Sequence, residues 1–244
     1  MTRFVRHDGR KSDDLRPVRI TPGFIRSAAG SCLIEVGGTR VVCTASFTPG
    51  VPKWRTGQGL GWMTAEYGML PASTSQRKDR PIGKPDGRSV EIQRIIGRVL
   101  RSAVRLDRLG ENTIYLDCDV LEADGGTRTA AITGAWVALA RAVDSLAGRG
   151  LCHREAVSPP VAAISVGMVD GRALLDLDYS EDSTAEVDMN IAMTAGGKYV
   201  EIQGSSEGRP FGGSDLEAML SLARRGIRRL HVLQRQAVRK RIRP

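Results

Sequence analysis

Two arginines follow glycines where helices are predicted to begin. Arg128 lies in the segment 124–129 (DGGTRT), and Arg88 lies in the segment 86–89 (DGRS). The first backbone N–H groups of a helix have no partner within the helix, so a helix start attracts anions. A cation at the same place is unfavourable by roughly 0.3–1 kcal/mol when it is exposed. Both arginines therefore indicate one shared anion, although each could instead pair with a nearby surface carboxylate.

Six acidic residues fall within the thirteen positions from Asp176 to Asp188. On a strand, Asp188 and Asn190 would face away from the apolar residues that alternate with them, and Asp182 precedes that strand in a turn. Carboxylate oxygens without histidine or cysteine are the ligands that a hard cation such as Mg²⁺ or Mn²⁺ takes. The cluster is therefore a candidate metal site, and a solvated acidic turn is the alternative.

The sequence argues against several other chemistries. It contains no GxxxxGK[ST] motif and no GxGxxG after a strand, and its three histidines stand in no nucleophile-activating context. The four cysteines lack the CxxC spacing of a zinc site. No stretch approaches the roughly 18 consecutive apolar residues of a membrane helix. The N-terminus lacks the apolar core of a signal peptide, so we expect a cytoplasmic protein with no membrane partner.

The net charge of +9 is concentrated at the C-terminal end. From Arg224 onward the chain carries nine Lys or Arg and no Asp or Glu, so the preceding residues hold 27 of each sign. Such a basic end suits a polyanion, nucleic acid first. A solvated helix with a basic end is the alternative.

A strand and a helix are predicted on either side of the segment 124–129. Residues 113–121 alternate between apolar and polar types with period two, as on a strand. Beyond the glycines, apolar residues recur on one face of a helix: Ile132, Trp136, Leu139, Val143 and Leu146. This order of strand, glycine turn and helix points free N–H groups outward.

The preceding part of the chain predicts strands at 18–24, 29–36, 39–47 and 63–70 and a helix at 90–106. The second and third strands form a hairpin that pairs Cys32 with Cys43, and we expect buried, reduced thiols there rather than a disulfide. A polar loop at 71–87 carries Arg77 and Arg80. Arg94 begins a basic stripe along the helix, which a solvated face explains more simply than an RNA or subunit contact.

The following part predicts strands at 162–169, 172–179, 187–193 and 199–203 and a helix at 215–236. We therefore expect an α+β fold in one domain, 1–244. It would consist of two similar halves, about 1–147 and 159–236, each an antiparallel sheet with helices, and a basic tail at 237–244.

Several ordered motifs resemble bacterial ribonuclease PH. They are GQG at 57–59, EYGMLP at 66–71, EIQR at 91–94, LDCDVL at 116–121, ADGGTRT at 123–129, ED at 181–182 and DMN at 188–190. The resemblance covers the chain from Gly9 to Gly208 and continues into the last helix. Where relatives often carry arginine, this chain has Ala72, although Arg77 and Arg80 remain for contacts with RNA.

The resemblance implies a phosphate-dependent 3′→5′ exoribonuclease that trims tRNA precursors, and other RNA such as rRNA, and releases nucleoside diphosphates. It places the phosphate on Arg88, Gly126, Thr127 and Arg128, and it gives Asp182 and Asp188 the metal-binding and catalytic roles. RNA contacts would fall on Arg77 and Arg80, and Arg94 of the basic stripe is a third candidate.

The resemblance also implies the architecture and the assembly. The fold would be two βαβ-type halves in two layers, related to the ribosomal-protein domain 2-like fold, and six chains would form a ring, a trimer of dimers. Two alternatives remain: a non-catalytic RNA-binding subunit of an exosome-like ring, and a hydrolytic nuclease that uses metal-bound water.

Overall fold

The computed structural model describes residues 6–80, 83, 86–207 and 210–240. Its first sheet has the strand order β1-β2-β3-β5-β4. These strands are β1 (Val18–Pro22), β2 (Gly30–Val36), β3 (Thr39–Pro49), β4 (Trp62–Met69) and β5 (Asn112–Glu122). The predicted hairpin is confirmed, because Cys32 lies opposite Cys43 in the β2–β3 register. Cys118 of β5 lies opposite Cys43 in turn, and all three thiols are free and buried.

The first sheet is mixed, and the prediction of an antiparallel sheet is wrong for one pair. β4 and β5 run parallel. The helix α1 (Gly87–Arg101) connects them, and a crossover helix is what brings the chain back to start a parallel neighbour. α1 also ends before the predicted Leu106. The hydroxyl of Ser102 donates to the carbonyl of Val99, and Val104 then forms a bridge with Val157 instead of another helical turn.

The second sheet is antiparallel, in the order β7-β6-β8-β9. Its strands are β6 (Val161–Val169), β7 (Arg172–Leu175), β8 (Val187–Thr194) and β9 (Tyr199–Ser206). β7 ends before the predicted Tyr179, because Asp176 adopts a left-handed backbone with φ 56° that breaks the ladder. The short helix α3 (Tyr179–Asp182) follows.

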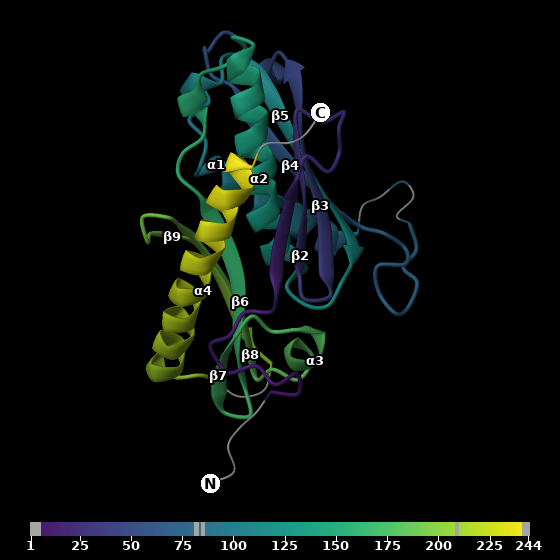
Figure 1. Ribbon diagram of the computed structural model, residues 1–244, viewed down its shortest axis with the longest axis vertical. Coiled ribbons are helices and arrows are strands. Elements are labelled where there is room, and N and C mark those ends of the chain that lie inside the picture. The colour runs from purple at the N-terminus through teal and green to yellow at the C-terminus, as the bar shows by residue number, and fades with distance from the viewer. Residues whose placement is uncertain (1–5, 81–82, 84–85, 208–209, 241–244) are drawn as a thin grey trace.

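Two long helices join the sheets into one body. α2 (Thr127–Gly148) packs against β2 and β3 of the first sheet and β6 of the second, and α4 (Gly213–Arg239) packs against β6 and β7. Figure 1 shows α4 along the outside of the second sheet and α2 between α4 and the first sheet. The C-terminal residues 241–244 of the predicted basic tail lie outside the described residues.

α2 is the one helix in the described ranges whose length and composition would allow it to cross a membrane. Most of its apolar window is buried within the protein, as in the core helix of a two-sheet fold. Its N-terminus emerges from the core next to the second sheet. Three shorter 3-10 helices lie in the connections: η1 (Lys53–Arg55), η2 (Leu106–Arg108) and η3 (Arg154–Ala156).

Candidate active site

Two consecutive glycines form the loop that precedes α2. Gly125 and Gly126 have φ of 73° and 66°, which is a left-handed backbone that side chains disfavour. A Cβ atom on Gly125 would also lie 2.6 Å from the backbone carbon of Asp178. Gly126 is the N-cap of α2 and supplies no side-chain cap. The first amides of this helix are therefore free of side-chain acceptors, as the predicted anion site requires.

The loop is held from behind by buried polar groups. The Thr39 hydroxyl accepts from the Asp124 N–H at 2.9 Å and donates to the Gly125 carbonyl at 2.6 Å. The Arg16 guanidinium donates to the Asp124 carbonyl and binds the Asp176 carboxylate through Nε at 3.1 Å and Nη2 at 2.7 Å. With its carbonyls engaged on this side, the loop keeps its amides directed away from these partners.

The two helix-start arginines share one environment. Arg88 and Arg128 both act electrostatically on the Tyr67 hydroxyl and on the Asp182 carboxylate. Burial raises the pKa of Tyr67 although both arginines oppose that shift. Its hydroxyl donates to the Thr127 hydroxyl at 2.9 Å, which links β4 to the start of α2. No carboxylate among the described residues forms an ion pair with either arginine, so surface ion pairing does not explain them.

Asp182 and Asp188 face these arginines from the second sheet. Asp182 is the last residue of α3, and Asp188 lies on β8 with its side chain away from Val187 and Met189, as predicted. Burial raises the pKa of Asp188 to about 6, and the negative charge of Asp182 adds to the shift. Burial also raises the pKa of Asp182, while Arg128 and Arg88 oppose it.

One oxygen of Asp188 identifies what this pair could bind. Its Oδ1 is buried without a hydrogen-bond partner in the described structure, while Oδ2 accepts from the Asn190 amide at 3.3 Å. A buried orphan oxygen is costly unless a ligand completes it. Asp182 and Asp188 offer carboxylate oxygens, and no described histidine or cysteine forms a ligand group with them. Such a donor set fits a hard cation such as Mg²⁺ or Mn²⁺. We name Arg88, Arg128, Asp182 and Asp188 the cleft cluster.

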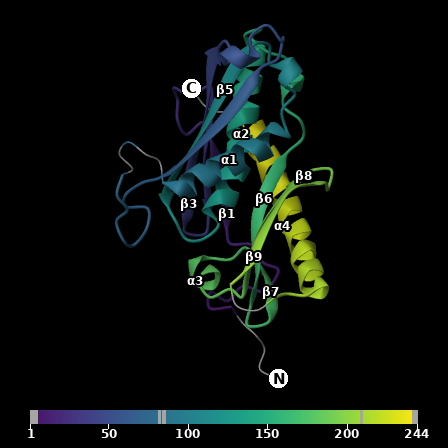
Figure 2. The same ribbon diagram turned by 180° about the vertical axis from the view of Figure 1, so that it is seen from behind.

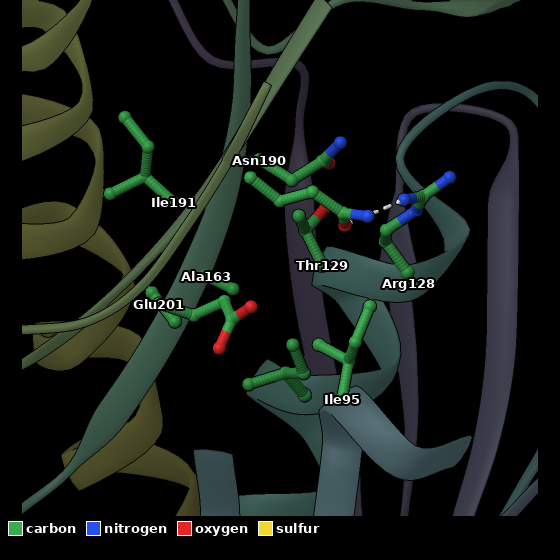
Figure 3. Close-up of a pocket in the computed structure, with 10 residues that line it drawn as sticks. Ile95, Arg128, Thr129, Ala163, Asn190, Ile191 and Glu201 are labelled. Carbon is green, nitrogen blue, oxygen red and sulfur yellow. Dashed lines mark hydrogen bonds between the residues drawn. The ribbon is translucent and has the colours of Figure 1, made fainter. Parts of the chain in front are cut away.

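A hydrogen-bond chain orients Arg128 between the two sheets. Its Nη1 donates to the Gln203 side-chain oxygen at 3.0 Å, and the Gln203 amide donates to Glu91 of α1 at 2.9 Å. Figure 3 shows Arg128 and Asn190 with Ile95 of α1 around the small pocket where α1, α2, β8 and β9 meet. The pocket thus lies directly beside the cleft cluster, at the junction of the two halves.

The rest of the predicted acidic cluster has a different role. Asp176, Asp178 and Glu181 are buried rather than solvated. They bind three arginines of the N-terminal arm, which the sequence predicted only as irregular. We name this set the arm cluster: Arg6, Arg10, Arg16, Asp176, Asp178 and Glu181.

His7, Asp178 and Glu181 lie close enough together to suggest a second metal site. However, both Glu181 oxygens accept from Arg6, and Asp178 accepts from Ser180 at 3.0 Å and bonds His7 at 2.7 Å. Carboxylates that are already satisfied by donors have no oxygen left for a cation. These carboxylates are therefore less available to a cation than Asp188, whose Oδ1 has no partner among the described groups.

The predicted RNA-binding residues lie at separate places on the surface. Arg77 and Arg80 are exposed in the loop after β4, where Arg77 binds Asp79 at 2.6 Å. Arg94 is exposed on α1, six residues or about 1.7 turns beyond Arg88. Glu186, the remaining acid of the predicted cluster, accepts from the Gly171 N–H at 3.0 Å, at the turn between β6 and β7.

Reasoning from the sequence missed the supporting residues Arg16, Thr39, Tyr67 and Gln203. Tyr67 stands within the EYGMLP motif, which was a usable signal. Gln203 and Arg16 gave none, because their partners lie 75 and 160 positions away along the chain.

Comparisons with known proteins cover almost the whole chain. Residues 14–143 match the model of the 3′ exoribonuclease family, domain 1, and residues 159–226 match domain 2 of the same family. Proteins named ribonuclease PH from Mycobacterium sp. (strain KMS) and from Mycolicibacterium smegmatis (strain ATCC 700084 / mc(2)155) are similar along almost the whole chain. Each is 58% identical over 236 residues, which is 96% of this chain and 91% of the relative.

Solved structures share the fold at lower identity. A chain of the Archaeoglobus fulgidus exosome with RNA bound to the active site aligns with a TM-score of 0.79 and 24% identity, over 93% of this chain and 92% of that one. Rice Rrp46 aligns with a TM-score of 0.79 and 18% identity, over 96% of this chain and 100% of the other.

Proposed function

The chain belongs to the 3′ exoribonuclease family, and we propose that its cleft cluster carries out the phosphorolysis that distinguishes ribonuclease PH. The protein is a phosphorolytic 3′→5′ exoribonuclease, and inorganic phosphate is its co-substrate. The observation that supports this assignment is the juxtaposition of two helix-start arginines, which form no ion pair with a described carboxylate, and an Asp188 oxygen without a partner among the described groups.

Phosphate is bound by groups that the fold has already oriented. The guanidinium groups of Arg88 and Arg128 and the amides at the start of α2 donate to its oxygens, and Thr127 adds a hydroxyl that Tyr67 positions. Arg128 is held by Gln203 at 3.0 Å, so it loses little freedom when the anion binds. These donors reduce the repulsion between a phosphate dianion and the anionic phosphodiester that it must approach.

The reaction balances without a net proton from the protein. An oxygen of hydrogenphosphate bonds to the phosphorus of the terminal phosphodiester, and the bond from that phosphorus to the 3′ oxygen of the preceding nucleotide breaks. The proton of hydrogenphosphate balances the new 3′ hydroxyl. A divalent cation held by Asp182 and Asp188 would supply charge neutralisation at the transferred phosphoryl group. Because the products conserve a diphosphate bond, the reverse reaction should add nucleotides from diphosphates when phosphate is scarce.

The substrates are proposed to be tRNA precursors and other RNA 3′ ends such as those of rRNA, bound in part by Arg77, Arg80 and Arg94. We assign Mg²⁺ or Mn²⁺ as the cation, the cytoplasm as the location and a homohexamer, a trimer of dimers, as the assembly. The name of the relatives and the exosome among the structural neighbours support the substrates and the ring, and the oxygen-only donor set supports the cation.

One experiment tests the function directly. RNA with a labelled 3′ terminus is incubated with the protein, with and without inorganic phosphate, and the released nucleotide is identified. We expect nucleoside diphosphates that appear only when phosphate is present. Nucleoside monophosphates would indicate a hydrolytic nuclease, and no release would indicate a non-catalytic RNA-binding subunit.

A further inference from the structure

An exposed tryptophan lies beside arginines at the end of β4 far from the cleft. Trp54 of η1 is 59% exposed, the second most exposed of the large apolar side chains. Its ring meets that of Trp62, the first residue of β4, edge to face, with centroids 4.8 Å apart and planes at 84°. This contact uses one edge of the pair and leaves much of the Trp54 ring open to a flat ligand.

Guanidinium groups surround the two indoles. The Arg55 guanidinium carbon lies 5.6 Å from both ring centroids, and that of Arg101 lies 5.3 Å from the Trp62 centroid. Arg101 is anchored to β4, because it donates to the Met63 carbonyl at 3.3 Å. These cation–π contacts fix the arginines beside the rings.

The positive charge of this cluster is not neutralised by an ion pair within the part of the chain that the structure describes. No carboxylate in the described residues forms an ion pair with Lys53, Arg55 or Arg101, whereas the next arginine along α1, Arg98, binds Glu201 at 2.8 Å. An open aromatic face with unpaired cations around it is complementary to a ligand that carries both flat rings and phosphates. Single-stranded nucleic acid has this chemistry, since bases stack on aromatic side chains while basic groups contact the backbone.

α1 connects this cluster to the cleft. It begins beside Arg88 in the cleft cluster and ends at Arg101 over Trp62, thirteen residues or about 20 Å further on. Figure 2 shows α1 across the near side of the molecule, with α3 and β9 below it. Arg94 lies between the two ends on an exposed position. A strand of stacked bases, at about 3.4 Å each, would cover that distance with roughly six nucleotides.

We propose that Trp54, Trp62, Arg55 and Arg101, with Lys53 beside them, form a second RNA-binding site. It stacks a base of the single-stranded segment several nucleotides upstream of the 3′ terminus. The direction along the RNA rests on the proposed function, which places the 3′ terminus in the cleft. The site itself rests on the open indole and the unpaired cations.

Substrates of two lengths distinguish the contribution of this site to KM from that of the cleft cluster. Phosphorolysis of an oligoribonucleotide of about three residues should be unchanged in Trp54→Ala, because such a substrate cannot span α1. The KM for one of about twelve residues should rise about tenfold, the loss expected for one stacked base. Arg55→Gln should give the same pattern, and Phe24→Ala removes an exposed aromatic from the loop after β1 as a matched control. Equal KM changes for both lengths would overturn the proposal.

RNA binding measured without phosphate tests this site independently of the proposed phosphorolysis. Without phosphate, the twelve-residue oligonucleotide should quench tryptophan fluorescence in the wild type, and the quenching should fall by more than half in Trp54→Ala. Unaltered quenching in that variant would overturn the proposal. So would a change of oligomeric state in sedimentation without any length dependence, because that would identify Trp54 as a contact between subunits.

Discussion

Two clusters of arginines and carboxylates lie next to the loop 124–126, and they differ in whether their carboxylates form ion pairs. In the arm cluster every carboxylate is bound by an arginine, as in the Arg16–Asp176 pair at 2.7 Å. In the cleft cluster the same residue types share an environment without forming an ion pair, and one oxygen of Asp188 has no partner among the described groups. Composition does not distinguish the two clusters, but pairing does.

The difference distinguishes charged groups that stabilise the fold from charged groups that are available to a ligand. A buried charge that has its partner fixes the backbone around it, and the arm cluster fixes the glycine loop and α3. A buried charge without its partner is a cost to stability that a ligand can relieve. We therefore expect substitutions in the cleft cluster to remove activity and spare stability, and substitutions in the arm cluster to reduce stability first.

The largest effect is expected for Asp188→Asn. The amide cannot supply the negative charge that a cation requires, so kcat should fall at least a thousandfold, about 4 kcal/mol in activation free energy. The free energy of unfolding should be unchanged or higher, because burial already disfavours the ionised Asp188. Single-turnover phosphorolysis and urea unfolding measure the two quantities.

RNA binding gives the control for this variant. In a gel-shift assay Asp188→Asn should still bind RNA, since the proposed RNA contacts lie elsewhere. Lost binding with intact chemistry would assign Asp188 to the RNA site and end the contrast between the clusters.

Asp176→Asn should give the reverse outcome. Asp176 and Arg16 are only 1% and 5% exposed, and the amide would leave the guanidinium without a counter-charge. We expect the free energy of unfolding to fall by about 3 kcal/mol, within the range for a broken buried pair. Asp8→Asn, which removes a more exposed partner of Arg10, should cost less than about 1 kcal/mol. Equal losses in the two variants would mean that burial does not set the strength of these pairs.

A smaller effect is expected for Arg128→Ala, which removes one of the proposed phosphate donors. Loss of a hydrogen bond to a charged group should weaken the use of phosphate by about 1.5–3 kcal/mol. The measurement is the initial rate against phosphate concentration at saturating RNA. Arg77→Ala is the matched control, because it removes an arginine from the exposed loop and should leave the phosphate dependence unaltered. An unchanged dependence in Arg128→Ala would defeat the phosphate assignment.

The features of the two clusters that depend on neighbouring residues could be predicted from the sequence. The hairpin register, the two helix-start arginines and the outward side of β8 all depend on neighbours in the chain, and periodicity reads those directly. The resemblance to ribonuclease PH selected Asp182 and Asp188 from six acids. No rule of spacing would have separated these two from Asp176, Asp178 and Glu181.

The remainder depends on contacts between distant segments. Arg6 reaches Glu181 across 175 positions, and β4 pairs with β5 in parallel only because α1 packs over the sheet. An irregular, charged arm has no period from which burial could be predicted. The arm cluster was therefore invisible to the sequence, although it supports the loop that the sequence identified most clearly.

The smallest effects are expected in the pH dependence of stability, and the two clusters should differ in sign. Burial acts to raise the pKa of Asp178, but hydrogen bonds from the Glu181 N–H, Ser180 and His7 outweigh it and lower that pKa to about 2 from the ordinary 3.8. Its contribution is thus present above pH 3.8 and is lost as the pH falls toward 2. Asp188, with its pKa raised to about 6, binds a proton in the folded state that the unfolded chain releases above 3.8. Stability should therefore fall as the pH rises from 3.8 to 6.

Urea unfolding across this pH range, with divalent ions chelated, can separate the two contributions. Discounted for solvent screening, each should amount to about 1 kcal/mol. The slope between pH 3.8 and 6 should be absent from Asp188→Asn, and the slope below 3.8 should be absent from Asp178→Asn. Added Mg²⁺ should flatten only the Asp188 slope, because a cation stabilises the ionised carboxylate while the arm cluster offers it no free oxygen. If Mg²⁺ changed both slopes equally, the two clusters would not differ in their availability to ligands.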